Sequence, residues 1–403
     1  MRIPAMLTSL AGGALALSIV SCAAAQPGAD APLDWRAGEA DMLRNHVQLT
    51  FPSDFEKAGE AYFNRDATWV VFQAIPAPAP GEEADADYSM YIAPLERDAD
   101  GRITGLGEAT LLSPPGSANT CGWFHPLYSH RVIYGSTLTA PAPGDKPGYQ
   151  RGESRYAWAF PPEMEVVQQS VPRIWRAEHP DRPEPMWAED ALRPVPMWTM
   201  PGYDAECSIS PDARFVVFTH VDAETNDPDL WIHDVETGEQ WPIVEAPGYD
   251  GGPFFSPDGK RLVYRSDRVG NDLLQVYVAD LEFDDVGRPV GVATEHEITA
   301  NEHVNWAPYW HPSGEFLVYA TSEVGHWNYE VYAIAVPPVG DAVATQSLAK
   351  RRITLASGFD GLPVFSNDGS LMMWTRQRAG AEPGEDRPSS QIWIAETIET
   401  NPR

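Results

Sequence analysis

Short apolar runs separated by turn signals recur along this chain, and the pattern predicts β-strands rather than helices. The clearest unit is residues 248–282, which read GYDGGPFFSPDGKRLVYRSDRVGNDLLQVYVADLE. An apolar strand at 252–255 leads into the hairpin turn Pro257-Asp258-Gly259, and two more strands are expected at 261–265 and 274–279. Because one such sheet cannot bury both of its faces, the unit needs copies of itself beside it.

Similar segments lie at 59–75, 119–137, 202–220, 304–336 and 359–378. The residue at the proline position of each turn, here called the turn residue, marks the register: Arg65, Pro126, Pro211, Pro257, Pro312 and Asn367. The longest interval separates the second and third turn residues, which predicts an insertion at 141–199 with a third strand inside 160–169. We therefore predict an all-β fold, a six-bladed β-propeller of four-stranded blades.

The ends of the repeat array predict how the ring closes. Strands at 110–112, 241–244, 297–299 and 352–354 each complete a unit as its outer, fourth strand. The last unit stops after its third strand at 391–396, whereas a spare strand at 46–51 precedes the first unit. We expect this N-terminal strand to pair with the last blade and so leave no open edge.

The first residues resemble a targeting segment. Residues 1–21 form a short apolar signal peptide that ends in Ile19-Val20-Ser21-Cys22, which resembles the lipobox of bacterial lipoproteins. That resemblance implies a lipidated Cys22, followed by a flexible linker over 22–44 and the propeller over 45–403. The alternative is an ordinary secretory signal cut after residues 23–25. Both predict that the protein is exported. The lipobox further predicts a periplasmic or outer-membrane lipoprotein that touches the membrane only through its lipid anchor.

The repeated motifs resemble a known family. Apolar strands, S/H-P-D/S-G turns and D-L-Y/W strands over residues 46–397, outside the insertion, resemble the TolB-like six-bladed propellers, extracytoplasmic relatives of WD40-like repeats. GYDAECSISPD, GYDGGPFFSPDG, NTCGWFHP and GHWNYEVY are similar to a secreted subgroup of undefined activity, whose members are sometimes fused to peptidase or amidohydrolase domains. The fold alone does not specify a function, because propellers host many.

The charge balance limits the partners. Asp and Glu number 58 against 28 Lys and Arg, which gives a formal net charge of -30. Nucleic acid and anionic lipid headgroups are therefore poor partners, whereas cations and basic protein patches are favoured. The alternative is that the charge serves solubility alone.

Five of the six units carry Asp or Asn seven residues before the turn residue, where the innermost strand begins at one mouth of the channel, and the first unit has Ala58 there. Two residues further on, Glu60 and Glu206 add carboxylates. Such oxygens suit a hard cation such as Ca²⁺, or a basic peptide. The candidate ligands are Asn119, Asp204, Glu206, Asp250, Asn305 and Asp360. The alternative is turn chemistry, because Asx side chains cap their own backbone.

Two cysteines besides Cys22 fall on inner strands of the second and third units. Cys121 and Cys207 lie five and four residues before their turn residues, so regular alternation would place them on opposite faces. On adjacent blades, opposite faces meet, and we predict a Cys121–Cys207 disulfide of the kind that an oxidising periplasm permits. Two buried free thiols are the alternative, and a reactive catalytic cysteine is not expected, because neither cysteine has an obvious His partner in the sequence.

No catalytic machinery is recognisable: the sequence has no G-x-S-x-G elbow, no phosphate-binding glycine loop and no separate catalytic domain after the last unit. We therefore expect a monomeric binding protein without catalytic residues, which recognises a protein or peptide of the cell envelope at the acidic channel mouth. One alternative is a Ca²⁺-dependent hydrolase of the lactonase or esterase type. Another is a polysaccharide-binding protein that uses coplanar Trp faces in residues 170–199.

Overall fold

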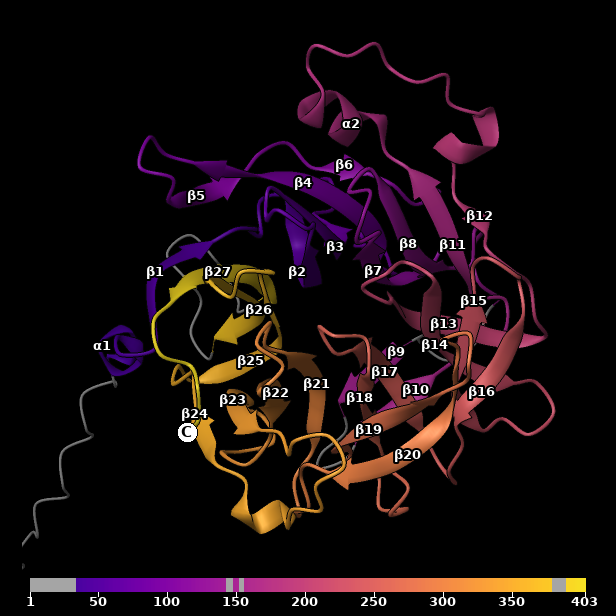
Figure 1. Cartoon of the computed structure of the whole chain (residues 1–403). Helices are drawn as coiled ribbons and strands as arrows, with labels where there is room; N and C mark the ends of the chain where they lie inside the picture. The colour runs from indigo at the N-terminus through magenta and orange to yellow at the C-terminus, as the bar shows by residue number, and fades with distance from the viewer. Residues whose placement is uncertain (1–33, 143–147, 152–155, 379–388) are drawn as a thin grey trace, which may run out of the picture. The chain divides into compact units, whose positions relative to one another are not determined.

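The computed structural model describes residues 34–142, 148–151, 156–378 and 389–403, and residues 35–403 form one compact unit. Its strands form antiparallel sheets arranged as a ring around a central channel (Figure 1). The signal peptide, Cys22 and most of the linker fall outside the described residues. Within the described part of the chain, no helix has the length and apolar character needed to cross a bilayer.

Six sheets make the ring, and the predicted all-β, six-bladed propeller is confirmed. Blades 1 and 2 contain β2 (Phe55–Phe63), β3 (Trp69–Pro76), β4 (Ser89–Arg97), β5 (Ile103–Leu106) and β6 (Thr110–Leu111), then β7 (Asn119–Phe124), β8 (Arg131–Ser136), β11 (Glu165–Ser170) and β12 (Val195–Pro196). Blades 3 and 4 contain β13 (Gly202–Ile209), β14 (Phe215–Asp222), β15 (Pro228–Asp234) and β16 (Gln240–Val244), then β17 (Asp250–Phe255), β18 (Arg261–Ser266), β19 (Gln275–Phe283) and β20 (Pro289–Glu297). Blades 5 and 6 contain β21 (Asn305–Trp310), β22 (Phe316–Thr321), β23 (Glu330–Ala335) and β24 (Lys350–Arg352), then β25 (Gly358–Phe365), β26 (Leu371–Arg378), β27 (Gln391–Thr397) and β1 (Leu43–Gln48).

The expected insertion lies in blade 2. It holds the hairpin of β9 (Gly148–Arg151) and β10 (Tyr156–Ala159), the short helix α2 (Pro172–Glu178) and a 3₁₀ turn at Glu189–Leu192. The predicted third strand within it is β11, which pairs with β8 on one side and β12 on the other.

The repeated turn explains why each first hairpin forms. In blade 4 the Ser256 hydroxyl donates to Asp258 (2.5 Å) and accepts the Arg261 N–H (3.0 Å), so one side chain satisfies both ends of the turn. Ser210 and Ser366 make the same bonds in blades 3 and 6. The S-P/N-D sequence signal therefore identifies a hydrogen-bonded turn and not only a lack of apolar residues.

The ring closes as predicted, through the N-terminal strand. β1 pairs antiparallel with β27, with Leu43 opposite Thr397 and Gln48 opposite Trp393. The strand occupies 43–48 rather than 46–51, because residues 49–51 leave the sheet after one further bond from the Leu49 N–H to Ile392 O (2.8 Å). The first and last parts of the chain thus share one blade (Figure 1).

A buried cation holds the helix before β1 against this closing blade. The guanidinium of Arg376 lies 3.9 Å from the ring centroid of Trp35, in α1 (Trp35–Glu39), and 5.4 Å from that of Trp393. Arg376 Nε also pairs with Asp360 Oδ1 (3.2 Å), and Glu39 accepts from the Leu355 N–H (2.8 Å). Cation–π and ionic contacts therefore add to the strand pairing that closes the ring.

Each innermost strand contains a bulge at one repeated position. The ladder register shifts there in all six blades, and the residue five before the turn residue has a positive φ of 47–59°. Only one of these six bulge residues is glycine, although the left-handed region costs about 1–2 kcal/mol for other residues. The bulge residues are Glu60, Cys121, Glu206, Gly252, Ala307 and Leu362.

Replacing Leu43 by Ala should lower the free energy of unfolding by about 2–5 kcal/mol, because it leaves a cavity where β1 closes the ring. Denaturant titration measures this loss. Arg44→Ala is the matched control in the same strand: its ion pair with Glu396 (2.8 Å) is exposed, so a change of at most about 1 kcal/mol is expected. Equal losses in both variants would contradict a packed closing strand.

Gly252→Ala should destabilise the protein by about 2–4 kcal/mol. A Cβ at this position would lie 2.0 Å from Nη1 of Arg265, whose buried side chain is held by Glu206 (3.2 Å) and the Tyr249 hydroxyl (2.8 Å), and φ is +59°. The reverse change at the equivalent position, Ala307→Gly, should stay within about 1 kcal/mol, since relief of the left-handed strain offsets the added chain entropy. Denaturant titration of both variants checks the contrast, and a Gly252→Ala variant as stable as the parent would refute it.

Candidate functional site

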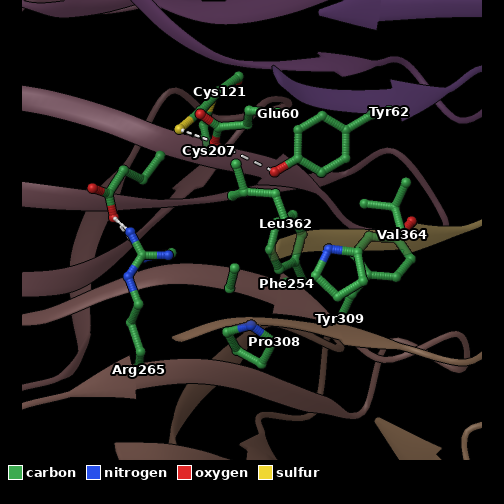
Figure 2. A pocket seen from close by; sticks show the side chains of 14 residues that line it. Glu60, Tyr62, Cys121, Cys207, Phe254, Arg265, Pro308, Tyr309, Leu362 and Val364 are labelled. Carbon is green, nitrogen blue, oxygen red and sulfur yellow. Dashed lines mark hydrogen bonds and ion pairs between the residues drawn. The ribbon is translucent and has the colours of Figure 1, made fainter. Parts of the chain in front are cut away.

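All six bulge residues line one small pocket inside the ring, here called the waist, and Figure 2 shows Glu60, Cys121 and Leu362 among its side chains. The cavity that they line has a volume of about 20 Å³, which is room for about one water molecule. Beneath it the rings of Tyr62, Trp123, Phe254 and Tyr309 pack against one another with centroid distances of 5.2–6.4 Å. The channel is therefore two separate mouths rather than an open passage.

The two mouths differ in chemistry. The mouth where the inner strands begin, here called the acidic mouth, has a volume of about 310 Å³, and its charged lining residues are Lys57, Glu60, Asp87, Glu206 and Arg265. The opposite, turn-side mouth has a volume of about 410 Å³ and is lined mainly by aromatic side chains and turn prolines. No Asp or Glu is among the described residues that line the turn-side mouth, although acidic residues outnumber basic ones twofold in the chain.

A buried ion pair crosses the waist between blades 3 and 4. Glu206 Oε2 lies 3.2 Å from Arg265 Nη2 and accepts hydrogen bonds from the Tyr249 hydroxyl (2.6 Å) and the Gly252 N–H (2.7 Å). Burial opposes the charge on Arg265, but Tyr249 and Glu206 outweigh it and raise the pKa of the guanidinium. The pair Gly251-Gly252 makes the cluster possible, because a Cβ at Gly251 would also strike the Tyr249 hydroxyl at 2.1 Å.

The second carboxylate of the waist has neutral neighbours. The Cys121 thiol donates to Glu60 Oε1 (2.9 Å), and the Tyr62 hydroxyl lies 3.5 Å from the same oxygen. Burial raises the pKa of Glu60, although the Cys121 hydrogen bond and the charge of Arg265 partly oppose it. Burial and the nearby Glu60 also raise the pKa of the Cys121 thiol well above its usual range, which favours the neutral thiol that donates to Glu60.

Cys121 and Cys207 are neighbours, as expected, but no disulfide joins them in the structure and both are free thiols. Cys207 Sγ lies 3.9 Å from the carbonyl oxygen of Cys121. The expectation assumed regular alternation along both strands, whereas Cys121 is itself the bulge residue of β7 with a φ of 54°. The left-handed backbone turns its side chain toward Glu60, so strand parity does not describe this position.

The five Asx residues lie where blades meet, and each is buried. Each side chain is bonded within its own blade or to the preceding one. The closest partners of Asn119, Asp204, Asp250, Asn305 and Asp360 are, in turn, the Ser117 carbonyl (2.8 Å), His220 (2.6 Å), Arg268 (2.9 Å), Gln275 (2.9 Å) and Trp374 (3.0 Å). Of the six candidate ligands, Glu206 lines the waist, and Asn119 joins it in lining the acidic mouth.

The structure thus distributes the candidate ligands among several blade junctions rather than around one point. Across the described ranges, no three His, Cys, Asp or Glu side chains form a group that could hold a metal ion. Calcium binding by these residues stays a prediction from the sequence.

The sequence analysis identified Glu60. It did not identify Arg265, nor the bulge that brings one residue of each inner strand to the waist. The signal was available in part: the position five before each turn residue holds glycine in blade 4, where φ is +59°. In the other five blades a non-glycine residue takes the same conformation, and sequence preferences give no hint of it.

The insertion has no stacked Trp platform among its described residues. Trp175 and Trp187 meet edge-on at 84°, and Trp175 stacks on His179 instead (3.9 Å). Trp198 stacks on His233 and donates to Asp204 (2.8 Å), so it belongs to the junction between blades 2 and 3.

Comparison with known proteins gives distant matches. No protein-family model matches the chain. It is 26% identical over 120 residues to an uncharacterized protein of Agrobacterium fabrum, and 25% identical over 169 residues to the Tol-Pal system protein TolB of Wolinella succinogenes. These segments cover 30% and 42% of this chain but only 36% and 35% of the relatives, so the chain matches about a third of their length. The crystal structure of TolB from Acinetobacter baumannii superposes with a TM-score of 0.47 and 14% identity over 86% of this chain and 65% of that one. The chain is a six-bladed β-propeller with distant, TolB-like homology.

Proposed function

We propose that this chain is a binding module that recognises a protein or peptide partner of the cell envelope at its acidic mouth. The observation that carries the proposal is the Glu60 carboxylate at the closed inner end of this mouth. Its side-chain contacts among the described residues are the Cys121 thiol and the Tyr62 hydroxyl. The nearest cation, Arg265, is bonded to Glu206 instead. A lysine side chain or an amino terminus of a partner would supply the charge that Glu60 lacks.

The rim of the mouth supports the same class of partner. Asp87 adds a second carboxyl there, and burial together with Asp85 raises its pKa. Lys57 lies over the ring of Tyr88 (4.7 Å). The aromatic packing below the waist blocks passage, so a bound segment ends in the mouth rather than threading the ring.

The proposal also includes export of the chain and its attachment to a membrane. A lipid on Cys22 and a linker over 22–44 would hold the propeller at a membrane surface in the periplasm or at the outer membrane. The Wolinella relative is by name a component of the Tol-Pal system, which supports a role in assembly with other proteins.

A dye-labelled lysine tripeptide should bind the purified chain saturably in fluorescence polarisation, and Glu60→Gln should weaken it at least about tenfold, since a desolvated charge pair contributes about 2–5 kcal/mol. Affinity should fall with added salt and rise with pH, because a bound cation favours the ionised carboxyl of Glu60, whose pKa is raised in the free protein.

Glu282→Gln is the matched control, since it removes the same charge from an exposed position in blade 4 that does not line the mouth. A glutamate tripeptide is the control ligand. Equal binding of both tripeptides, or an unchanged affinity in Glu60→Gln, would contradict recognition at the acidic mouth.

A further inference from the structure

The turn-side mouth is built by the same repeat as the waist. All six turn residues line it, and this set is here called the collar: Arg65, Pro126, Pro211, Pro257, Pro312 and Asn367. Proline fixes its own φ and offers no N–H donor, so four of the six blades present a stiff, apolar edge to the opening. A collar of this kind keeps its shape without a ligand, which lowers the cost of binding one.

Large apolar side chains line the mouth between the collar and the waist. The residue two before the turn residue is apolar in every blade, and all six of these residues line the mouth: Phe63, Phe124, Ile209, Phe255, Trp310 and Phe365. Trp123, Phe254 and Tyr309 also line it and pack against one another, with ring centroids 5.3–6.3 Å apart. The wall and the inner end of the mouth are therefore mainly aromatic.

The turns themselves keep acidic side chains out of this wall. In blades 3, 4 and 6 an Asp follows the turn residue, and its carboxylate accepts a hydrogen bond from the serine hydroxyl that precedes the turn residue. The three pairs are Asp212 with Ser210 (2.5 Å), Asp258 with Ser256 (2.5 Å) and Asp368 with Ser366 (2.6 Å). Each acid is thus held within its own turn, and none of the three is among the residues that line the mouth.

The collar has one polar sector, where blades 6 and 1 meet. Asn367 Nδ2 donates to the backbone carbonyl of Arg65 (3.1 Å), so the two residues lie side by side. Arg65 is exposed, and its guanidinium forms no ion pair with a described residue. His125 lines the same mouth, but burial and the nearby Arg131 lower the pKa of its imidazole to about 4. Arg65 is therefore the one charged group among the described lining residues at neutral pH.

The size of the mouth suits a small molecule. Its volume of about 410 Å³ lies in the range of roughly 300–1,000 Å³ that is typical of ligand pockets. The aromatic packing below the waist closes the inner end, so a ligand that enters from this side stays in the mouth. Such pockets are mostly apolar and use a few polar groups to orient the ligand, which is the arrangement found here.

We propose that the turn-side mouth binds a small molecule that combines a flat aromatic body with one carboxylate. The body lies against Trp123, Phe254 and Tyr309, where its burial and ring contacts stabilise the complex. The carboxylate lies on Arg65, whose planar guanidinium can donate two parallel hydrogen bonds to it.

A cationic ligand fits this mouth less well. No acid among the described lining residues would pair with it, and Arg65 would repel it. The site goes beyond the peptide-binding function proposed above, because the closed waist separates the two mouths.

The test is isothermal titration calorimetry of the purified chain with 2-naphthoate, which should bind saturably. An ionic strength of about 0.15 M is used, because it largely screens exposed charges more than about 8 Å away. Two molecules with the same ring system are the control ligands. Neutral 2-naphthalenemethanol should bind about fivefold more weakly, and the cation (2-naphthylmethyl)trimethylammonium should bind more weakly still.

Arg65→Gln should weaken 2-naphthoate about fivefold and leave the neutral alcohol unchanged, so that the two ligands bind alike. Arg102→Gln is the matched control, since Arg102 is equally exposed but does not line the mouth. It should bind 2-naphthoate as the parent does.

A second variant places an acid in the mouth. Leu127 lines it and is half-exposed, so Leu127→Glu should fold normally and weaken 2-naphthoate at least about tenfold through repulsion of the carboxylate. Val269→Glu adds the same charge at an exposed position that does not line the mouth and should have no effect. Thermal unfolding midpoints equal to that of the parent check that the four variants are folded.

The proposal would be overturned by a lack of saturable 2-naphthoate binding, or by equal affinities for the three ligands. Tighter binding of the ammonium ligand would overturn it too, because the aromatic rings would then form a cation site. An unchanged affinity in Arg65→Gln would contradict the role of the guanidinium. Saturating 2-naphthoate should leave the affinity for the lysine tripeptide unchanged, and competition between the two would place the naphthoate in the wrong mouth.

Discussion

Each blade of this ring has two apolar faces, and only contact with the blades on both sides removes them from water. The whole structure therefore depends on closure, which joins residues from opposite ends of the chain. β1 supplies the strand that β27 lacks, and the Trp35–Arg376 contact fixes the helix before it. Losing β1 would leave β27 as an unpaired edge strand of blade 6.

The same repetition builds the candidate site. A bulge in each inner strand directs one residue per blade to the waist, and the fold fixes this geometry whatever the side chain is. Function then comes from the differences: carboxylates in blades 1 and 3, a thiol in blade 2, and a glycine in blade 4 that admits Arg265 from the strand behind. A symmetric scaffold thus carries an asymmetric polar cluster, with acid on one side of the waist and aromatic rings on the other.

The polar residues at the blade junctions have a structural role that differs from that of the waist residues. They lie away from the waist, they are buried, and they bond to neighbours across or within blades. At the junction between blades 4 and 5, for example, Gln275 accepts a hydrogen bond from Asn305 (2.9 Å), so the two amides satisfy each other.

The sequence by itself determined the repeats, the blade boundaries, the insertion and the closing strand, because alternating apolar strands and S-P/N-D turns are local signals. It also identified the Asx positions and the two cysteines on neighbouring blades. Only the tertiary structure decided what these residues contact. The bulge at Cys121 breaks the alternation on which its orientation was inferred, and the Asx side chains face blade junctions rather than one metal site. Glu60, Cys121, Glu206 and Arg265 come together because four blades converge on one axis, a relation between distant segments that no local pattern contains.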